Sequence, residues 1–491
     1  MLFNSYQFMI FFPTVLLIFF VIPKKLRQIW LLIVSLFFYA CWNPKYLFLL
    51  LTSIVVTFTC ALFMDKLRKK KKLILVAGLF INFLILFFFK YYGFAIDSIN
   101  SLIPGGRIQL VDRFDVILPV GISFYMFQSV GYMIDVYRGD VKVEKNFVKY
   151  ALFVSFFPQL VAGPIERSKN ILSQIDDITD KKLLDFDRVK SGFIYMIWGF
   201  FLKIVIADRI AVIVDEVFNR YYSYGTFVLI LGAVCFALQI YCDFASYSTI
   251  AIGSAQIMGF TLMENFETPY FAMSIKEFWR RWHISLSMWF RDYLYIPLGG
   301  SRCSKIKKYR NIIITFLVSG LWHGANWTYV LWGGLHGLYQ VVGEILKPVR
   351  NNIHSILGTN TDNFSYKLSC VLKTFILTDF AWIFFRADNI RVAFEFIGRM
   401  LTHFDPWVLT DGSIYKLGLD YTQMHILWVS LLTLLVVELI RYKKNIIISD
   451  AICSQGVIFQ IICVYVLIMA IVVFGKYGPS EEMKAFIYFQ F

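Results

Sequence analysis

Two histidines stand in segments rich in apolar and aromatic residues. His323 lies in the sequence SGLWHGANW, residues 319–327, and no residue from Asn311 to Gly343 carries a formal charge. An ionisable group at membrane depth is costly and is by default a functional candidate. A neutral imidazole can accept a proton from a hydroxyl group, so this position favours general base catalysis. The alternative is a histidine that only forms a hydrogen bond between helices.

The second histidine, His283, lies in the densest polar cluster of the chain. This cluster is NFETPYFAMSIKEFWRRWHISLSMWFRDYLYIPLGGSR, residues 265–302. If it is one helix, two neighbouring faces form: Trp279, His283, Leu286 and Phe290 on one, and Phe278, Trp282, Ser285 and Trp289 on the other. An interfacial amphipathic helix with Trp anchors and snorkelling Arg accounts for the aromatics and most of the charge. It accounts less well for an imidazole between two aromatic positions.

Other catalytic templates are missing from the sequence. It contains no HExxH, GxxxxGK, GxSxG or GxGxxG motif. The histidines His283, His323 and His336 have no carboxylate at ligand spacing, so no metal site is expected. The remaining histidines fall in loops or at the ends of apolar runs and are interpreted as surface residues: His354, His403 and His425.

The elements that hold these residues must suit a bilayer. Of the 491 residues, 58% are hydrophobic and 16% are charged, and the mean hydropathy is +0.63. A soluble domain carries about a quarter charged residues, and its interior cannot bury so much apolar surface. The composition therefore excludes an ordinary soluble enzyme and predicts a polytopic protein surrounded by membrane lipids.

Twelve apolar runs are candidates for membrane spans. They cover residues 8–22, 29–42, 46–64, 73–92, 116–134, 193–217, 227–258, 312–325, 327–346, 368–385, 424–440 and 457–474. Loops holding 34 Lys and Arg alternate with loops holding ten, and the richer set is placed in the cytoplasm. Both chain ends are then outside, the loop 261–311 is inside, and the net charge of +15 needs no nucleic-acid partner.

One apolar segment, 150–165, is interrupted by Pro158, Gly163 and Pro164. Broken backbone is tolerated at membrane depth only where protein buries it, so we expect a re-entrant segment here instead of a crossing. The first run, 8–22, lacks a preceding basic residue and a small-residue cleavage site, so we expect a retained span.

Small residues are spaced for close helix packing around His323. Gly320 and Gly324, then Gly333 and Gly337, form two small-xxx-small pairs. The eight Cys form no Cys-x-x-Cys pair and are interpreted as buried small hydrophobes. Because the sequence has no internal repeat, flexible linker or low-complexity tract, we predict one membrane domain over residues 1–475.

Several long stretches of the chain resemble one known family. They are LPVGISFYMFQSVGYMIDVYRG (118–139), FFPQLVAGPIER (156–167), QIYCDFASYSTIAIGSAQIMGF (239–260), the cluster 265–302, SGLWHGANW (319–327) and WIFFRADN (382–389). The chain is identified as a member of the membrane-bound O-acyltransferase (MBOAT) family. It is similar to the bacterial branch with alginate and peptidoglycan O-acetyltransferase membrane subunits and the teichoic acid D-alanyltransferase.

The resemblance implies a fold and a set of roles. The fold is all-α, with about 11–12 transmembrane helices plus re-entrant and interfacial helices around a central tunnel, and a catalytic core at about 118–390. The catalytic residue is His323, with His283 as a second polar residue of the tunnel. Tunnel or oxyanion roles fall to Trp322 and Asn326.

The last residues, FIYFQF, also match a pattern of this branch, Phe-x-Tyr-x-x-Phe. The resemblance makes Tyr488, in the extracytoplasmic tail 476–491, a candidate acyl acceptor. The alternative is an aromatic tail that docks at the membrane interface.

The implied function is transfer of an acyl group, in the first instance acetyl, from a cytoplasmic thioester to hydroxyls of a cell-envelope or exported polysaccharide. The donor is acetyl-CoA or an acyl carrier protein, with no bound cofactor, and Arg280, Arg281 and Arg291 are candidates for binding its phosphates. An extracytoplasmic SGNH-hydrolase-like transferase is the expected partner, and the bacterial inner membrane is the expected location. The alternatives are D-alanyl or other acyl transfer to teichoic acid, lipid or protein, and a polysaccharide transporter or flippase.

Overall fold

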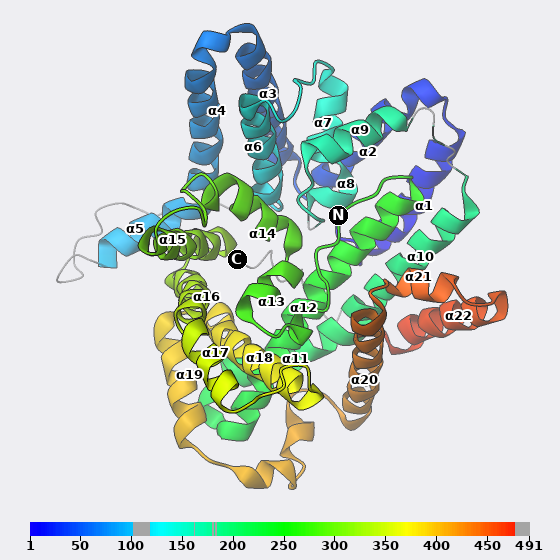
Figure 1. Cartoon of the computed structure of the whole chain (residues 1–491). Coiled ribbons are helices and arrows are strands. Elements are labelled where there is room, and N and C mark those ends of the chain that lie inside the picture. The colour runs from blue at the N-terminus through cyan, green and yellow to red at the C-terminus, as the bar shows by residue number, and fades with distance from the viewer. Residues whose placement is uncertain (102–117, 162, 179–180, 182–183, 477–491) are drawn as a thin grey trace. The chain divides into compact units, whose positions relative to one another are not determined.

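The computed structural model describes residues 1–101, 118–161, 163–178, 181 and 184–476, and these residues form helices and loops without a strand (Figure 1). The predicted all-α class is therefore confirmed. The helices of four or more residues up to the middle of the chain are α1 (Tyr6–Val21), α2 (Arg27–Ala40), α3 (Pro44–Lys66), α4 (Lys71–Leu86), α5 (Tyr92–Ser101), α6 (Ile122–Arg138), α7 (Phe147–Ser155), α8 (Phe157–Leu160), α9 (Ser168–Asp177), α10 (Phe186–Phe200), α11 (Asp208–Asn219) and α12 (Thr226–Ile257).

The second half of the chain continues in the same way. Its α-helices are α13 (Ile275–Arg281), α14 (Ile284–Phe290), α15 (Lys305–His323), α16 (Trp327–Ile345), α17 (Lys347–Ile356), α18 (Phe364–Arg386), α19 (Ile390–Thr402), α20 (Tyr421–Lys444), α21 (Ile448–Cys453) and α22 (Val457–Phe474). Three π-helical stretches are inserted at Phe87–Tyr91, Phe201–Ala207 and Arg291–Tyr295.

Within the described residues, six helical stretches are long and apolar enough to cross a membrane. They are Pro44–Lys66, Arg68–Ser101, Thr226–Ile257, Phe364–Arg386, Tyr421–Lys444 and Val457–Phe474. The protein is thus a multi-pass membrane protein. The expected run 193–217, which contains the π-helix Phe201–Ala207 and the charged residues Lys203, Asp208 and Arg209, is not among these six stretches. The total of about 11–12 spans stays a prediction.

The chain folds into two compact units, and each is described by itself. The first contains Met1–Met196 and Ile250–Met263, and the second contains Ile197–Thr249 and Glu264–Phe491. Helices α10 and α12 each contribute residues to both units. In the first unit these two helices touch through their glycines, because a Cβ on Gly192 would lie 2.8 Å from the carbonyl oxygen of Gly253.

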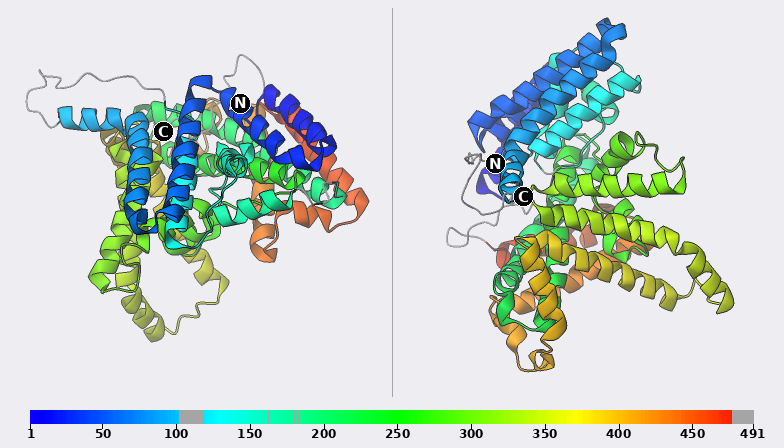
Figure 2. Two further views of the ribbon diagram at one scale, coloured as in Figure 1. Left: turned by 90° about the horizontal axis from the view of Figure 1, so that it is seen from above. Right: turned by 90° about the vertical axis from the view of Figure 1, so that its left-hand side faces the viewer.

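In the first unit, α3, α4 and α6 pack side by side (Figure 2). Gly78 of α4 permits this approach, since an added Cβ would lie 2.9 Å from the sulfurs of both Cys60 and Met133. The segment 150–165 is a broken helix: α7 ends at Ser155 and the short α8 follows. The predicted interruption of this segment is therefore present, and its described residues are buried.

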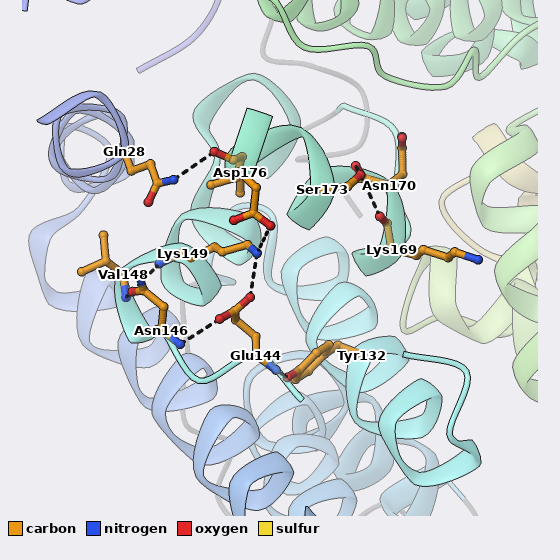
Figure 3. A network of polar contacts seen from close by, with 11 residues as sticks. Gln28, Tyr132, Glu144, Asn146, Val148, Lys149, Lys169, Asn170, Ser173 and Asp176 are labelled. Atoms are coloured by element: carbon orange, nitrogen blue, oxygen red, sulfur yellow. Dashed lines mark hydrogen bonds and ion pairs between the residues drawn. The ribbon is translucent and has the colours of Figure 1, made fainter. Parts of the chain in front are cut away.

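The first unit also contains a polar network around Lys149 of α7 (Figure 3). The ammonium group lies 2.8 Å from Glu144 and 2.5 Å from Asp176 of α9, and the Lys149 side chain is 11% exposed. Glu144 Oε1 also accepts a hydrogen bond from the backbone N–H of Asn146 at 2.8 Å. The network fastens α9 to the start of α7.

In the second unit, α15 and α16 form a tightly packed antiparallel pair. A Cβ on Gly320 would lie 2.2 Å from the carbonyl oxygen of Tyr329, and one on Gly333 would lie 2.2 Å from that of Phe316. Any larger residue would force the backbones apart. The close packing predicted for these glycines is confirmed, and it fixes the end of α15 where His323 lies.

Candidate functional site

The two candidate histidines meet in the second unit. His323 is the last residue of α15 and is 2% exposed, while His283 lies between α13 and α14 and is fully buried. The centroids of their rings are 6.5 Å apart. Residues from distant parts of the sequence therefore form one buried pair of imidazoles.

The backbone at His283 differs from the continuous helix considered for the cluster 265–302. Helix α13 ends at Arg281, and His283 adopts φ 42° and ψ 56°, the left-handed region. A non-glycine residue in this region is uncommon and costs about 1–3 kcal/mol, so surrounding contacts must hold it there. The proposed faces with four-residue spacing across His283 are therefore wrong, because the chain turns at this residue.

Asn265 supplies the contacts that hold this turn. Its carbonyl oxygen accepts a hydrogen bond from Ile284 N at 3.0 Å, and its Oδ1 accepts from Ser285 Oγ at 2.7 Å. Its Nδ2 donates to Ser248 Oγ of α12 at 2.8 Å. Asn265 is fully buried, and it positions His283. Sequence reasoning missed it, although it opens the cluster that was singled out.

Aromatic rings surround both imidazoles. Trp322, Trp332 and Phe385 place their ring centroids 5.0, 4.9 and 5.6 Å from that of His323. The Phe244 ring meets His283 edge-on at 4.6 Å. Burial lowers the pKa of His283, which lies outside the six candidate spans, to about 3. This imidazole is therefore neutral near pH 7, as a proton acceptor must be.

A cavity of about 490 Å³ is lined by residues of α13, α14, α15 and α16. Its lining includes the cationic side chains Lys276, Arg280 and Arg291, and also Lys308, which is paired with Glu344 at 2.6 Å. The wall also includes Ser319, which precedes His323 by four residues on α15. Four residues rise about 6 Å along a helix and bring the chain back to the same face, so the cavity approaches His323 to within about one turn.

The three arginines predicted to bind a donor differ in whether they line the cavity and whether a carboxylate pairs with them. Arg280 lines the cavity and, like the previously unnoticed Lys276, forms no ion pair within the part of the chain that the structure describes. Arg291 also lines it, beside Asp292 at 2.7 Å. Arg281 does not line it and is bound to Glu277 at 2.9 Å.

The remaining predicted site residues lie as follows. Trp322 is buried, with its ring 6.1 Å from His283. Asn326 caps α16: its Oδ1 accepts from Thr328 N and its Nδ2 donates to Asp388 O, both at 3.0 Å. An oxyanion role for Asn326 would require one of these bonds to be exchanged. Tyr488 lies outside the described residues.

The fold is that of a multi-pass membrane protein. The two buried imidazoles and the cavity lined by cationic side chains form its candidate enzyme site. The chain belongs to the membrane-bound O-acyltransferase (MBOAT) family, whose model matches residues 141–356. That range contains both imidazoles and the cavity. The prediction of family membership is confirmed.

Named relatives narrow the class of enzyme. A probable alginate O-acetylase of Pseudomonas syringae pv. tomato is 38% identical over 415 residues, 84% of this chain and 77% of the relative. The peptidoglycan O-acetyltransferase of Helicobacter pylori is 35% identical over 433 residues, 82% of this chain and 80% of the relative. The teichoic acid D-alanyltransferase of Streptococcus thermophilus is 31% identical over 236 residues, 46% of this chain and 56% of the relative. The protein is therefore a membrane O-acyltransferase.

Proposed function

We propose that the enzyme transfers an acetyl group from a phosphopantetheine thioester to hydroxyl groups of a cell-envelope or exported polysaccharide. Similarity to an alginate O-acetylase and a peptidoglycan O-acetyltransferase over most of the chain supports this acceptor class. Acetyl-CoA and an acetylated carrier protein share the phosphopantetheine arm, so either is a suitable donor.

The observation that carries the proposal is the cavity, whose lining includes cationic side chains and Ser319, one helical turn before His323. A phosphate fits beside Lys276, Arg280 and Arg291, because guanidinium and ammonium groups bind phosphate oxygens. The amides of the pantetheine arm fit the polar groups on the wall: Ser287, Thr315, Ser319 and Gln340. The thioester then lies nearest His323.

The reaction follows from this placement. The acceptor oxygen attacks the thioester carbonyl carbon while His323 accepts the hydroxyl proton. The C–S bond then breaks, the new C–O ester bond remains, and the proton passes from the imidazolium to the leaving thiolate. His283 lies beside the reacting groups, and backbone amides, Trp322 or Asn326 are the candidates for stabilising the oxyanion.

The proposal includes an orientation. The donor binds on the cytoplasmic side of a bacterial inner membrane, because Lys276, Arg280 and Arg291 belong to the Lys- and Arg-rich loop 261–311. Both chain ends are outside, with residues 1–475 as one membrane domain. Tyr488 in the tail 476–491 receives the acyl group before an extracytoplasmic SGNH-hydrolase-like transferase delivers it to the polymer.

The central test replaces the base. His323→Gln, purified in detergent, should consume acetyl-CoA or acetylated carrier protein about 10²–10⁴-fold more slowly, which is the usual contribution of general base catalysis. His425→Gln is the matched control, because His425 is exposed. Equal thioester consumption by His323→Gln and wild type, with equal thermal stability, would remove His323 from the mechanism.

The tail has its own test. Tyr488→Phe keeps the ring and removes only the hydroxyl, so polymer acetylation in cells should be lost if this hydroxyl carries the acyl group. Mass spectrometry of the wild-type C-terminal peptide should find an acetyl ester on Tyr488. Normal polymer acetylation by Tyr488→Phe would leave the tyrosine as an interfacial anchor.

D-alanyl transfer to teichoic acid is the second candidate, supported by the relative from Streptococcus thermophilus. That match covers less than half of this chain, so we rank it below acetyl transfer. A D-alanyl carrier protein offered beside acetyl donors separates the two functions directly.

A further inference from the structure

The proposed mechanism leaves one buried histidine unused. His336 of α16 is fully buried, and aromatic rings enclose it. Its ring centroid lies 5.1 Å from those of both Trp279 and Trp332, and 6.1 Å from that of Phe278. No substrate reaches a ring enclosed in this way, so any effect of His336 on the reaction must pass through a neighbour.

That neighbour is Trp279. Its indole N–H donates a hydrogen bond to His336 Nδ1 at 3.2 Å. Because Nδ1 accepts, the proton of the neutral imidazole is on Nε2. Trp279 is also part of the cavity wall. His336 therefore holds in place an indole that borders the donor cavity.

Trp279 lines the cavity and is linked to His323 through one intervening ring, that of Trp332. Its ring packs edge-on against Phe316 at 5.2 Å, and it lies 5.7 Å from Trp332, whose ring touches that of His323 at 4.9 Å. The indole is 8% exposed and is fixed by one hydrogen bond and several ring contacts. Because neighbouring side chains contact it on several sides, this indole cannot change its rotamer to make room for a longer ligand.

We propose that Trp279 limits the size of the acyl group and that His336 is the positioning residue that keeps it in place. This inference rests on the proposed function, because it needs the thioester in the cavity. An acetyl group has only one carbon beyond the carbonyl. Each further CH₂ of a longer acyl group would clash with the indole of Trp279. Overpacking a closely packed site is unfavourable, so longer acyl groups are rejected.

The test is acyl selectivity, measured on the purified full-length chain with acetyl, butyryl and hexanoyl thioesters, each as CoA and as carrier-protein conjugates. Trp279→Leu should raise the ratio of butyryl to acetyl transfer at least about tenfold. His336→Phe removes the acceptor and should raise the ratio about threefold. His336→Asn, whose amide oxygen can replace Nδ1, should restore the wild-type ratio. Trp382→Phe is the matched control, a fully buried tryptophan outside the cavity wall, and should not change the ratio.

Binding measured in the His323→Gln background separates this inference from the proposed function. If thioesters bind to His323→Gln with the same butyryl-to-acetyl affinity ratio with and without Trp279→Leu, and the transfer ratio of Trp279→Leu alone equals that of wild type, the size limit is overturned and the donor site is retained. If wild type neither binds nor consumes any thioester, as CoA or as carrier-protein conjugate, both the proposed donor site and the size limit set by Trp279 are contradicted. A ratio that rises with Trp279→Leu and His336→Phe but not with Trp382→Phe supports the inference.

Discussion

The Lys149 network and the imidazole pair bury polar groups in opposite surroundings. In the network, one ammonium group lies within 2.8 Å of two carboxylates. At the imidazole pair, His283 and His323 are packed among aromatic rings, and their own ring centroids are 6.5 Å apart.

The difference indicates that the Lys149 network stabilises the fold, whereas the imidazole pair takes part in the reaction. A charge that is matched by opposite charges is stable and unreactive, so the network holds two helices together. The imidazole of His283, which burial keeps neutral, remains able to accept a proton. Changes in the first region should therefore affect stability, and changes in the second should affect rate.

After the loss of the base in His323→Gln, the largest expected effect is on rate, at His283. Asn tolerates the left-handed backbone, so His283→Asn removes the imidazole without straining the turn. We expect the rate of thioester consumption to fall about 100-fold or more, with thermal stability close to that of wild type. His425→Asn is the control. If His283→Asn instead lowered thermal stability and left the rate per folded molecule unchanged, His283 would be a structural residue like Lys149.

The next effect is on stability, at Lys149. Lys149→Met leaves the partly buried Glu144 without its cation and should destabilise the protein by about 2 kcal/mol. Thermal unfolding in detergent measures the change, and the rate per folded molecule should not alter. Lys145→Met is the control, since Lys145 is an exposed lysine of the same loop. An equal loss of stability in both variants would mean that the network contributes nothing specific.

Arg280 and Arg281, neighbours in α13, allow the same comparison between a functional and a structural residue. Arg280→Gln removes a cation that faces the cavity, so the KM for the thioester donor should rise about tenfold, with a weaker dependence on salt. Arg281→Gln breaks the bond to Glu277 and should lower thermal stability while KM stays the same. Equal KM values for Arg280→Gln and wild type would place the phosphate elsewhere.

The smallest effect is the pH dependence of the network. Partial burial opposes ionisation of Glu144, but bonds from Lys149 and Asn146 N–H hold its pKa below the ordinary 4.5. Burial opposes the charge on Lys149, but Asp176 and Glu144 raise its pKa above 10.5. The stabilisation by Glu144 is therefore complete above pH 4.5 and is lost on acidification through its lowered pKa. That by Lys149 is complete below pH 10.5 and is lost as the pH rises through its raised pKa.

Unfolding measured across this range checks the prediction. The stability difference between wild type and Lys149→Met should be constant from about pH 5 to pH 10 and should shrink on both sides. A difference that varies with pH near 7 would point to a histidine instead of this network.

Much of the fold and part of the site can be predicted from the sequence because they depend on local patterns. Apolar length identifies six of the twelve predicted runs as candidate spans, and the glycine spacing identifies the close pair of α15 and α16. His323 is conspicuous because a stretch without formal charge surrounds it. These signals need no knowledge of contacts between distant residues.

The rest depends on contacts that the sequence does not display. The left-handed turn at His283 is held by Asn265, and only the folded chain shows that bond. Likewise, the wall of the cavity requires the bond from Trp279 to His336, which joins α13 to α16. Arg280 and Arg281 look alike in the sequence, and the turn of the helix alone gives them different partners.

The glycine contact between α10 and α12 limits how this protein can be dissected. Gly192 and Gly253 touch in a unit whose residues come from both sides of Ile197–Thr249. A gene fragment ending at Met196 would leave the Gly192 face exposed, and a fragment covering 141–356 would cut through both units. Expression, truncation and split-protein experiments therefore have to keep the whole chain, with any tag or cleavage site placed in an exposed loop such as 357–363.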